Sequence, residues 1–299
     1  MVRSKIEMQN YSKSNVKEIL MQTVFFGSAL VSVIAVIAIC LFLLMRGIPA
    51  IAEIGFIDFI FNESWKPTNN PPSYGILSMI VGSIYVTAGA IVIGVPIGIM
   101  CAVFLAEFCP DNLYKIIKPA VNLLSGIPSI IFGFFGMEIV VPFVRETIGG
   151  NGYSIISASI ILGIMILPTV ISLSESSIKA VPSSYKEGSY GLGATKEETV
   201  FKILVPAAKS GIFTSIILGI GRAIGETMAV VMVAGNAVMP IDKIKLLKPI
   251  RTLTTNIVTE MSYASGLHEE SLIATGVVLF VFIIILNTAL SLIKVKSNS

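Results

Sequence analysis

Six long apolar runs constrain this sequence more than any other feature. A helix needs about 20 apolar residues to cross the roughly 30 Å hydrocarbon core of a bilayer, and six stretches reach or approach that length. Because lipid offers the backbone no hydrogen-bond partners, each run is expected to be helical. The expected fold class is therefore all-α, a polytopic membrane protein with six transmembrane helices. The predicted spans are Val24–Met45, Ile76–Ala106, Ala120–Met137, Ser154–Ser174, Ile212–Gly235 and Ser271–Ile293.

Composition agrees with a membrane protein and narrows its chemistry. Only 13% of the 299 residues are charged, whereas about a quarter are charged in a typical soluble domain. The single histidine, His268, excludes His-based metal sites and Ser-His-Asp triads, and three scattered cysteines are too few for a disulfide framework. The sequence has no GxxxxGK(S/T) loop, so it cannot bind ATP in the P-loop manner. We therefore expect no catalytic residue, cofactor site or metal site on this chain.

Basic residues are distributed unequally between the two sides that six spans define. Thirteen of the 21 Lys and Arg residues lie in the two tails, the 107–119 connection and the 175–211 loop, and seven lie on the other side. Because cytoplasmic loops carry the excess of Lys and Arg, both termini are predicted to be cytoplasmic. The predicted domains are a cytoplasmic tail at 1–23, a six-helix membrane domain at 24–293 and a cytoplasmic tail at 294–299.

The outer loops contain aromatic and basic groups. Five aromatics flank the outer ends of spans and predict an interfacial belt or a short amphipathic helix, with a protein contact as the alternative. Four cations between 243 and 251 predict a solvated loop, with a partner-binding or anion-gathering patch as the alternative. The aromatics are Phe56, Phe59, Phe61, Trp65 and Tyr74.

Arg222 and Glu226 lie inside the fifth apolar run, which is otherwise uncharged. An ionised group at the centre of a membrane helix costs on the order of 3 kcal/mol on insertion scales, so it is rarely placed there without a role. Their i, i+4 spacing predicts that they share one helical face within pairing distance. A charged solute passing through the membrane is one explanation. A purely structural pair that fastens this helix to a neighbour is the other.

The third span is predicted to be broken at its centre. Gly126 and Pro128 free backbone groups that need partners, which at membrane depth means burial in protein or a water-lined cavity. The hydroxyls of Ser125 and Ser129 are expected to face such a cavity. A kink satisfied by neighbouring helices is the alternative.

The 175–211 loop contains signals for two short helices. Ser184 with Glu187, and Thr195 with Glu198, have the spacing of capping boxes. Gly191 and Gly193 lie between them as helix stops, and Pro206 lies near the end of the second helix. The pattern predicts a helical hairpin joined by a glycine turn, and a hairpin that only connects two spans would look the same.

This loop resembles the EAA loop of ABC-importer permeases. The matching residues are Glu187-Gly188-Ser189, Gly193, Ile203 and Pro206, and the departures are Gly188 and Ser189 for two alanines and Val205 for leucine. In that family the loop docks into a groove on the ATP-hydrolysing subunit and passes its closure to the spans. The resemblance implies the type I importer permease fold, called MetI-like, in a bacterial or archaeal inner membrane.

Further motifs are similar to the PstC-type permeases of phosphate importers, over residues 20–293. That resemblance implies a PstA-like second permease, two PstB-like subunits that bind the ATP, and a PstS-like phosphate-binding protein. It also adds Thr227 to the expected substrate pathway. The motifs are Ser64-Trp65-Lys66-Pro67, Tyr74-Gly75-Ile76-Leu77, Ser125-Gly126-Ile127-Pro128-Ser129, Phe132-Gly133-Phe134-Phe135-Gly136 and the run from Gly221 to Val230.

Arginine suits an oxyanion, because its guanidinium offers a fork of donors and stays charged. Arg222 is predicted to receive phosphate, and Glu226 is predicted to hold Arg222 when the path is empty. Three alternatives remain: a permease for another oxyanion such as molybdate, sulfate or phosphonate, a secondary transporter, and a membrane sensor that transports nothing. A secondary transporter would be expected to show repeated halves, which are not found here.

Overall fold

The computed structural model describes the backbone of residues 2–298 and the side chains of residues 17–289. It is helical throughout except for one two-stranded ladder, which pairs Trp65 with Tyr74 and Lys66 with Ser73. The elements are α1 (Val2–Ile54), α2 (Phe56–Phe61), β1 (Trp65–Lys66), β2 (Ser73–Tyr74), α3 (Leu77–Val103), η1 (Phe104–Phe108), α4 (Asp111–Gly126), α5 (Ser129–Phe135), η2 (Gly136–Val140), α6 (Val141–Thr147), α7 (Ile155–Lys179), α8 (Ser183–Gly191), α9 (Lys196–Thr199), η3 (Val200–Leu204), α10 (Val205–Ala207), α11 (Lys209–Gly225), α12 (Met228–Val233), η4 (Ile241–Lys243), α13 (Leu253–Glu260) and α14 (Leu267–Asn298).

Four helical segments of the described residues are long and apolar enough to cross a membrane. They are Lys17–Ile54, Leu77–Phe108, Ile155–Lys179 and Leu267–Ala289, and they contain or overlap the first, second, fourth and sixth predicted spans. Two bent helix pairs bring the number to six if each pair is one span. Asp111–Gly126 meets Ser129–Thr147 at 101°, and Lys196–Ala207 meets Lys209–Gly225 at 67°. Residues 2–23 continue the first span as one helix, α1.

The third predicted span is broken, as expected, and the break falls at Ile127 and Pro128. The fifth prediction, an uninterrupted helix over Ile212–Gly235, is wrong. Helix α11 ends at Gly225, Glu226 is extended with ψ 131°, and the short helix α12 begins at Met228. The Glu226 carboxylate accepts the backbone N–H groups of Thr227 and Ala229. A side chain that satisfies these donors allows the new helix to start, which hydrophobicity alone could not indicate.

Helix α7 is the centre of the molecule, and α3 packs along it. A Cβ on Gly94 would lie 2.6 Å from the Gly163 carbonyl oxygen, and one on Gly98 would lie 2.8 Å from Val170. The two glycines, four residues apart on one helical face, therefore let α3 approach α7 closely. By contrast, a Cβ at Gly221 or Gly225 would meet nothing within 4 Å, so this chain does not fill the face of α11 that they share.

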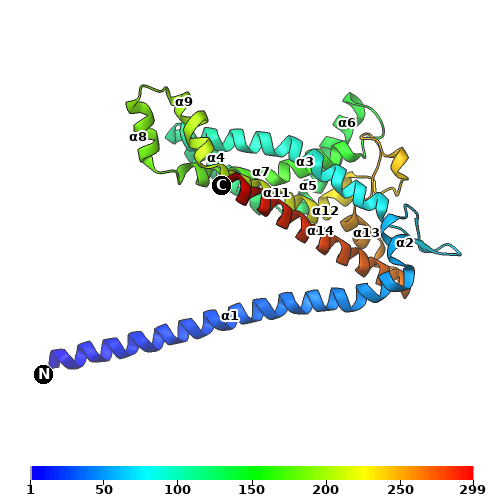
Figure 1. Ribbon diagram of the computed structural model, residues 1–299, viewed down its shortest axis with the longest axis horizontal. Helices are drawn as coiled ribbons and strands as arrows, with labels where there is room; N and C mark the ends of the chain where they lie inside the picture. The colour runs from blue at the N-terminus through cyan, green and yellow to red at the C-terminus, as the bar shows by residue number, and fades with distance from the viewer. Residues whose placement is uncertain (1, 299) are drawn as a thin grey trace.

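Helix α1 differs from α7 in being unburied. None of its most apolar window is buried, and it extends away from the body after contacting α14 near the α2 end (Figure 1). Helices α8 and α9 lie at one end of the body, which we call the hairpin end, and α2 and α13 lie at the other, the opposite end (Figure 1). A separate core joins η3 to α3, α7 and α11, and its buried members are Val103, Ile178, Val200, Leu204, Ala208 and Ile212.

Candidate functional site

Residues 183–207 form a helical hairpin, which we call the coupling hairpin. The predicted capping box at Thr195 is confirmed: its Oγ1 accepts the Glu198 N–H at 3.2 Å, and Glu198 Oε2 accepts the Thr195 N–H at 3.2 Å. The predicted box at Ser184 is wrong, because α8 begins at Ser183 directly after Pro182 with no side-chain cap. Proline fixes φ near its helical value, so it can start a helix without one.

The matched loop residues take different positions in the coupling hairpin. Glu187 and Gly188 are exposed on α8, whereas Ser189 is buried and its hydroxyl lies 2.8 Å from the Thr199 hydroxyl. Gly193 makes the turn with φ +83°, a conformation that favours glycine. Ile203 is half-buried and Pro206 is exposed. Thr199 was missed by sequence reasoning, because its contact with Ser189 crosses the turn.

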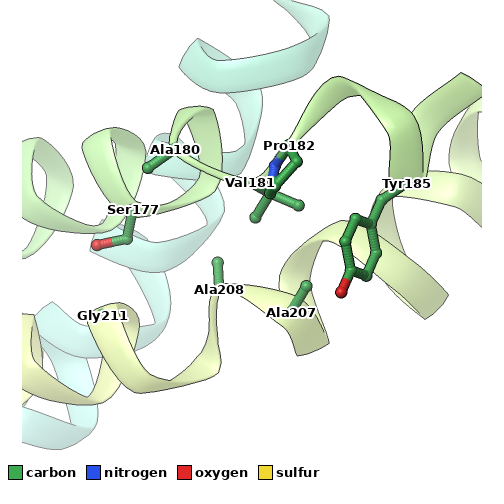
Figure 2. Close-up of a pocket in the computed structure, with 8 residues that line it drawn as sticks. All are labelled: Ser177, Ala180, Val181, Pro182, Tyr185, Ala207, Ala208 and Gly211. Carbon is green, nitrogen blue, oxygen red and sulfur yellow. The ribbon is translucent and has the colours of Figure 1, made fainter.

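The outer face of the coupling hairpin is apolar and uncovered. Leu192, at the turn, is 92% exposed, and Tyr185 and Phe201 are also exposed. A cavity of about 350 Å³ opens at the base of the hairpin, between the end of α7 and the start of α11, and Tyr185 lines it (Figure 2). Large apolar side chains that are exposed on one part of a surface are typical of a protein contact surface.

Arg222 and Glu226 do not form the predicted pair. Their helix ends at Gly225, so the i, i+4 geometry is lost, and among the described residues no ion pair joins them. Glu226 instead caps α12 through its contacts with Thr227 and Ala229, at 3.1 and 3.3 Å. The expectation that Glu226 holds Arg222 is therefore wrong for this conformation.

Arg222 lies near the middle of the membrane body. Gly219, one turn earlier on α11, packs against Ile166 and Val170, which are central in α7. The Arg222 side chain is half-buried, and at 3.6 residues per turn its position on α11 neighbours those of Gly221 and Gly225. The side of α11 that carries these glycines is left open by this chain, so the guanidinium borders space that a second subunit or a solute can occupy.

The two helix breaks lie side by side. Helix α5 packs on α12, with Gly133 against Ala229 and Met232. Ser129 is the first residue of α5, and Thr227 directly precedes α12. Because these two helices pack on each other, their first residues lie in the same region of the body. Ser129 is half-buried, and the Thr227 hydroxyl contacts the Gly225 carbonyl at 3.4 Å. Ser125 is exposed in the last turn of α4, with its hydroxyl donating to the Asn122 carbonyl at 2.7 Å.

A small cavity adjoins the Glu226 break. It measures about 10 Å³ and is lined by hydroxyls of α3 and of the start of α13, together with apolar side chains. The Thr254 hydroxyl donates to the Glu226 carbonyl at 3.0 Å, which fixes the break to that segment. The i, i+4 spacing of Ser83 and Thr87 inside an apolar run was the sequence signal for this wall. The hydroxyl residues are Ser83, Thr87, Thr252 and Thr254.

A buried carboxylate organises the opposite end. Glu260 accepts Trp65 Nε1–H at 2.8 Å, lies 2.9 Å from His268 Nε2 and is paired with Arg251. Burial raises the pKa of this carboxyl, but hydrogen bonds from Trp65, His268 and Arg251 outweigh it and hold the pKa below its ordinary value. The expectations of an aromatic belt at Trp65 and of a solvated Arg251 are wrong, because this carboxylate draws both inward.

Comparison with known proteins identifies the family and the fold of this chain. A family model described as "Binding-protein-dependent transport system inner membrane component" matches residues 94–295. In the solved structures, the chain resembles a bacterial alginate ABC transporter with a TM-score of 0.61 at 14% identity, covering 89% of this chain and 92% of that one. It also resembles the MetNI methionine ABC transporter, with a TM-score of 0.58 at 21% identity over 74% and 97% of the two chains. These two likenesses establish the MetI-like fold.

Curated relatives narrow the class. The chain is 38% identical to the probable ABC transporter permease protein YqgH of Bacillus subtilis, over 85% of this chain and 83% of that protein. It is also 38% identical to the phosphate transport system permease protein PstC of Mesorhizobium japonicum, over 78% and 76%. The probable PstC of Methanocaldococcus jannaschii is 33% identical over 82% and 84%. The chain belongs to the binding-protein-dependent ABC permease family, as a PstC-type member.

Membership fixes the general role of the molecule. It is a multi-pass membrane protein and a permease component, without catalytic activity of its own. Permeases of this family work with another permease, an ATPase and a binding protein. The open face of α11 and the exposed coupling hairpin are therefore available for contacts with such subunits.

Proposed function

We propose that this chain forms, with a PstA-like second permease, the transmembrane path for inorganic phosphate. Two PstB-like subunits bind and hydrolyse the ATP beneath the coupling hairpin, and a PstS-like protein delivers phosphate at the opposite end. The hairpin end and both termini lie in the cytoplasm, and the chain resides in the cell membrane of a bacterium or archaeon. The names of the PstC relatives and the excess of basic residues at the hairpin end support this assignment.

The observation that carries the proposal is Arg222 at mid-depth on a face that its own chain leaves open. A guanidinium binds phosphate oxygens through charge-assisted hydrogen bonds and stays protonated. Glu226, one turn further along and held at the break, places a negative charge near the path. That charge weakens anion binding, and transport requires release as well as entry.

Ser125, Ser129 and Thr227 supply hydroxyls beside this cation. All three lie at or next to the two adjacent helix breaks. Hydroxyls can donate to successive phosphate oxygens as the ion moves, and they add no charge that would trap it.

The test is phosphate uptake by the complete complex with Arg222→Gln, reconstituted in vesicles. Uptake is expected to fall about tenfold or more, since a lost hydrogen bond to a charged group costs on the order of 1.5–3 kcal/mol. Arg145→Gln is the matched control, because Arg145 is an exposed cation on α6 and its loss should leave uptake unchanged. Wild-type uptake of sulfate or molybdate in place of phosphate would assign the path to another oxyanion. Full phosphate uptake by Arg222→Gln would remove Arg222 from the path.

The coupling hairpin is proposed to dock on the ATPase through its apolar turn. Leu192→Asp is expected to reduce co-purification of the ATPase subunit, because the substitution puts a carboxylate into the contact. Leu246→Asp is the control, since Leu246 is also exposed but lies in the loop between η4 and α13, outside the hairpin and outside the membrane spans. Unchanged recovery of the ATPase with Leu192→Asp would contradict docking through this turn. ATP-driven import is favoured over a secondary transporter because the hairpin presents such a surface.

A further inference from the structure

An ion pair joins the coupling hairpin to a membrane span. Lys186, on α8, donates to the Glu107 carboxylate, which lies in η1 at the hairpin end of α3. Glu107 is largely buried, while Lys186 is about one-third exposed. The hydrogen bond to Glu107 outweighs burial and holds the pKa of Lys186 above its ordinary value, so the Lys186 ammonium keeps its charge at neutral pH.

Helix α8 has few other attachments to the body. The elements that it packs against most are η3 and α9, both within its own hairpin. Its buried polar contact, between Ser189 and Thr199, is also internal to the hairpin. Lys186 immediately precedes Glu187, the first residue of the matched loop, so the ion pair lies at the point where the hairpin is expected to receive force.

Helix α3 leads from this ion pair to the substrate path. With η1 it forms one helical segment over Leu77–Phe108, 32 residues long. Its other half carries Ser83 and Thr87, which line the cavity beside Glu226. Close glycine contacts hold α3 along α7, and the segment stays helical through Pro96 up to Phe108, so a displacement of its hairpin end can be passed along it.

We propose that the Lys186–Glu107 pair makes α3 move with α8, and so transmits closure of the ATPase to the Glu226 break. Both are positioning residues: neither touches the solute, and each acts through α3. The inference rests on the proposed function for what is transported, and adds the route by which the ATPase acts on the path.

Charge reversal tests the pair in the complete reconstituted complex. Lys186→Glu and Glu107→Lys are each expected to lower the phosphate moved per ATP hydrolysed by about fivefold or more, the lower end of typical coupling between sites. The double variant should recover most of that ratio. Because Glu107 is largely buried, recovery by Glu107→Lys cannot come from a repaired contact with the ATPase. Lys115→Glu, which reverses an exposed lysine on α4, is the control and should leave the ratio unchanged.

A distance measurement tests the tie without reference to phosphate. Spin labels are placed on Cys109, which directly follows η1, and on Ser184→Cys in α8, with Cys40 and Cys101 replaced by alanine. In the wild type, the distance between the two labels should be the same in the nucleotide-free and the vanadate-trapped complex. In Lys186→Glu, it should differ between these two complexes. An equal change with and without Lys186, or a double variant that stays uncoupled, would overturn the tie. Absence of phosphate uptake in the wild type would instead refute the proposed function and leave the distance result standing.

Discussion

The two ends of the molecule each hold a buried carboxylate with three donors, and the donors differ. At the hairpin end, Glu175 of α7 accepts Tyr114 and Lys179 on one oxygen and Lys118 on the other, each at 2.7 Å. At the opposite end, Glu260 binds Trp65, Arg251 and His268.

The difference between them lies in what the donors can do when the carboxylate is removed. At Glu175, the Lys179 side chain is 42% exposed and reaches solvent, whereas Lys118 is mostly buried and also contacts the Ser172 hydroxyl. At Glu260, Arg251 is mostly buried and donates in addition to the Asn236 carbonyl and to Asn256. Glu175 therefore joins α4 to α7 through a contact that is partly open to solvent. Glu260 joins β1, α13 and α14 into one unit through a contact that is closed to solvent.

The largest effect is expected from Glu260→Ala. Removing this carboxylate leaves Arg251 and the Trp65 N–H without their partner, and breaking a buried ion pair costs about 3 kcal/mol or more. Thermal unfolding in detergent should show a clear loss of stability. Glu269→Ala, an exposed carboxylate on the neighbouring helix turn, should not. Equal stabilities would show that the Glu260 cluster does not hold this end together.

The pH dependence of stability tests the same Glu260 cluster. Because the pKa of Glu260 is lower in the folded chain than in the unfolded chain, its contribution to stability is complete above the ordinary carboxyl pKa of about 4.3 and is lost as the pH falls below it. The wild type should therefore lose more stability than Glu260→Gln between about pH 5 and pH 3, measured by unfolding at each pH. Parallel curves would contradict the assignment.

Glu175→Gln is expected to cost less, roughly 1.5 kcal/mol, because Lys179 can turn to water when the charge is lost and Lys118 keeps its contact with Ser172. Its main effect should be on motion. Helix α4 has no fully buried residue and packs mainly on α7, so its amide hydrogens should exchange faster in the variant. An exchange rate on α4 that does not change would show that Glu175 is not its anchor.

The smallest effect is expected from Lys179→Gln. Lys179 is 42% exposed, so solvent screens its attraction to Glu175, and such pairs contribute less than about 1 kcal/mol. The difference from wild type should vanish in 1 M salt, where charges are screened within about 3 Å. Arg251→Gln, the matched change at the opposite end, should keep its cost in the same salt.

Local patterns in the sequence predicted the features that local physics decides. The apolar runs located most spans, Thr195 and Glu198 located a helix start, and Gly193 located the turn between α8 and α9. Pro128 located the break in the third span.

Features decided by distant partners could not be predicted in the same way. Trp65 reaches Glu260 across 195 positions, and Tyr114 reaches Glu175 across 61, so neither contact leaves a periodic signal. The Arg222–Glu226 pairing failed for a related reason. The i, i+4 rule assumes an unbroken helix, and the carboxylate that was assigned to Arg222 is used to begin the next one.

This chain does not cover the side of α11 that carries Gly221 and Gly225, so substitutions at these glycines report on contacts with another subunit. A methyl group at Gly221 touches nothing in this subunit, so Gly221→Ala costs the isolated fold no steric clash. Any loss of assembly or transport in that variant would then come from a contact with another subunit, and an alanine scan along this side would map that contact.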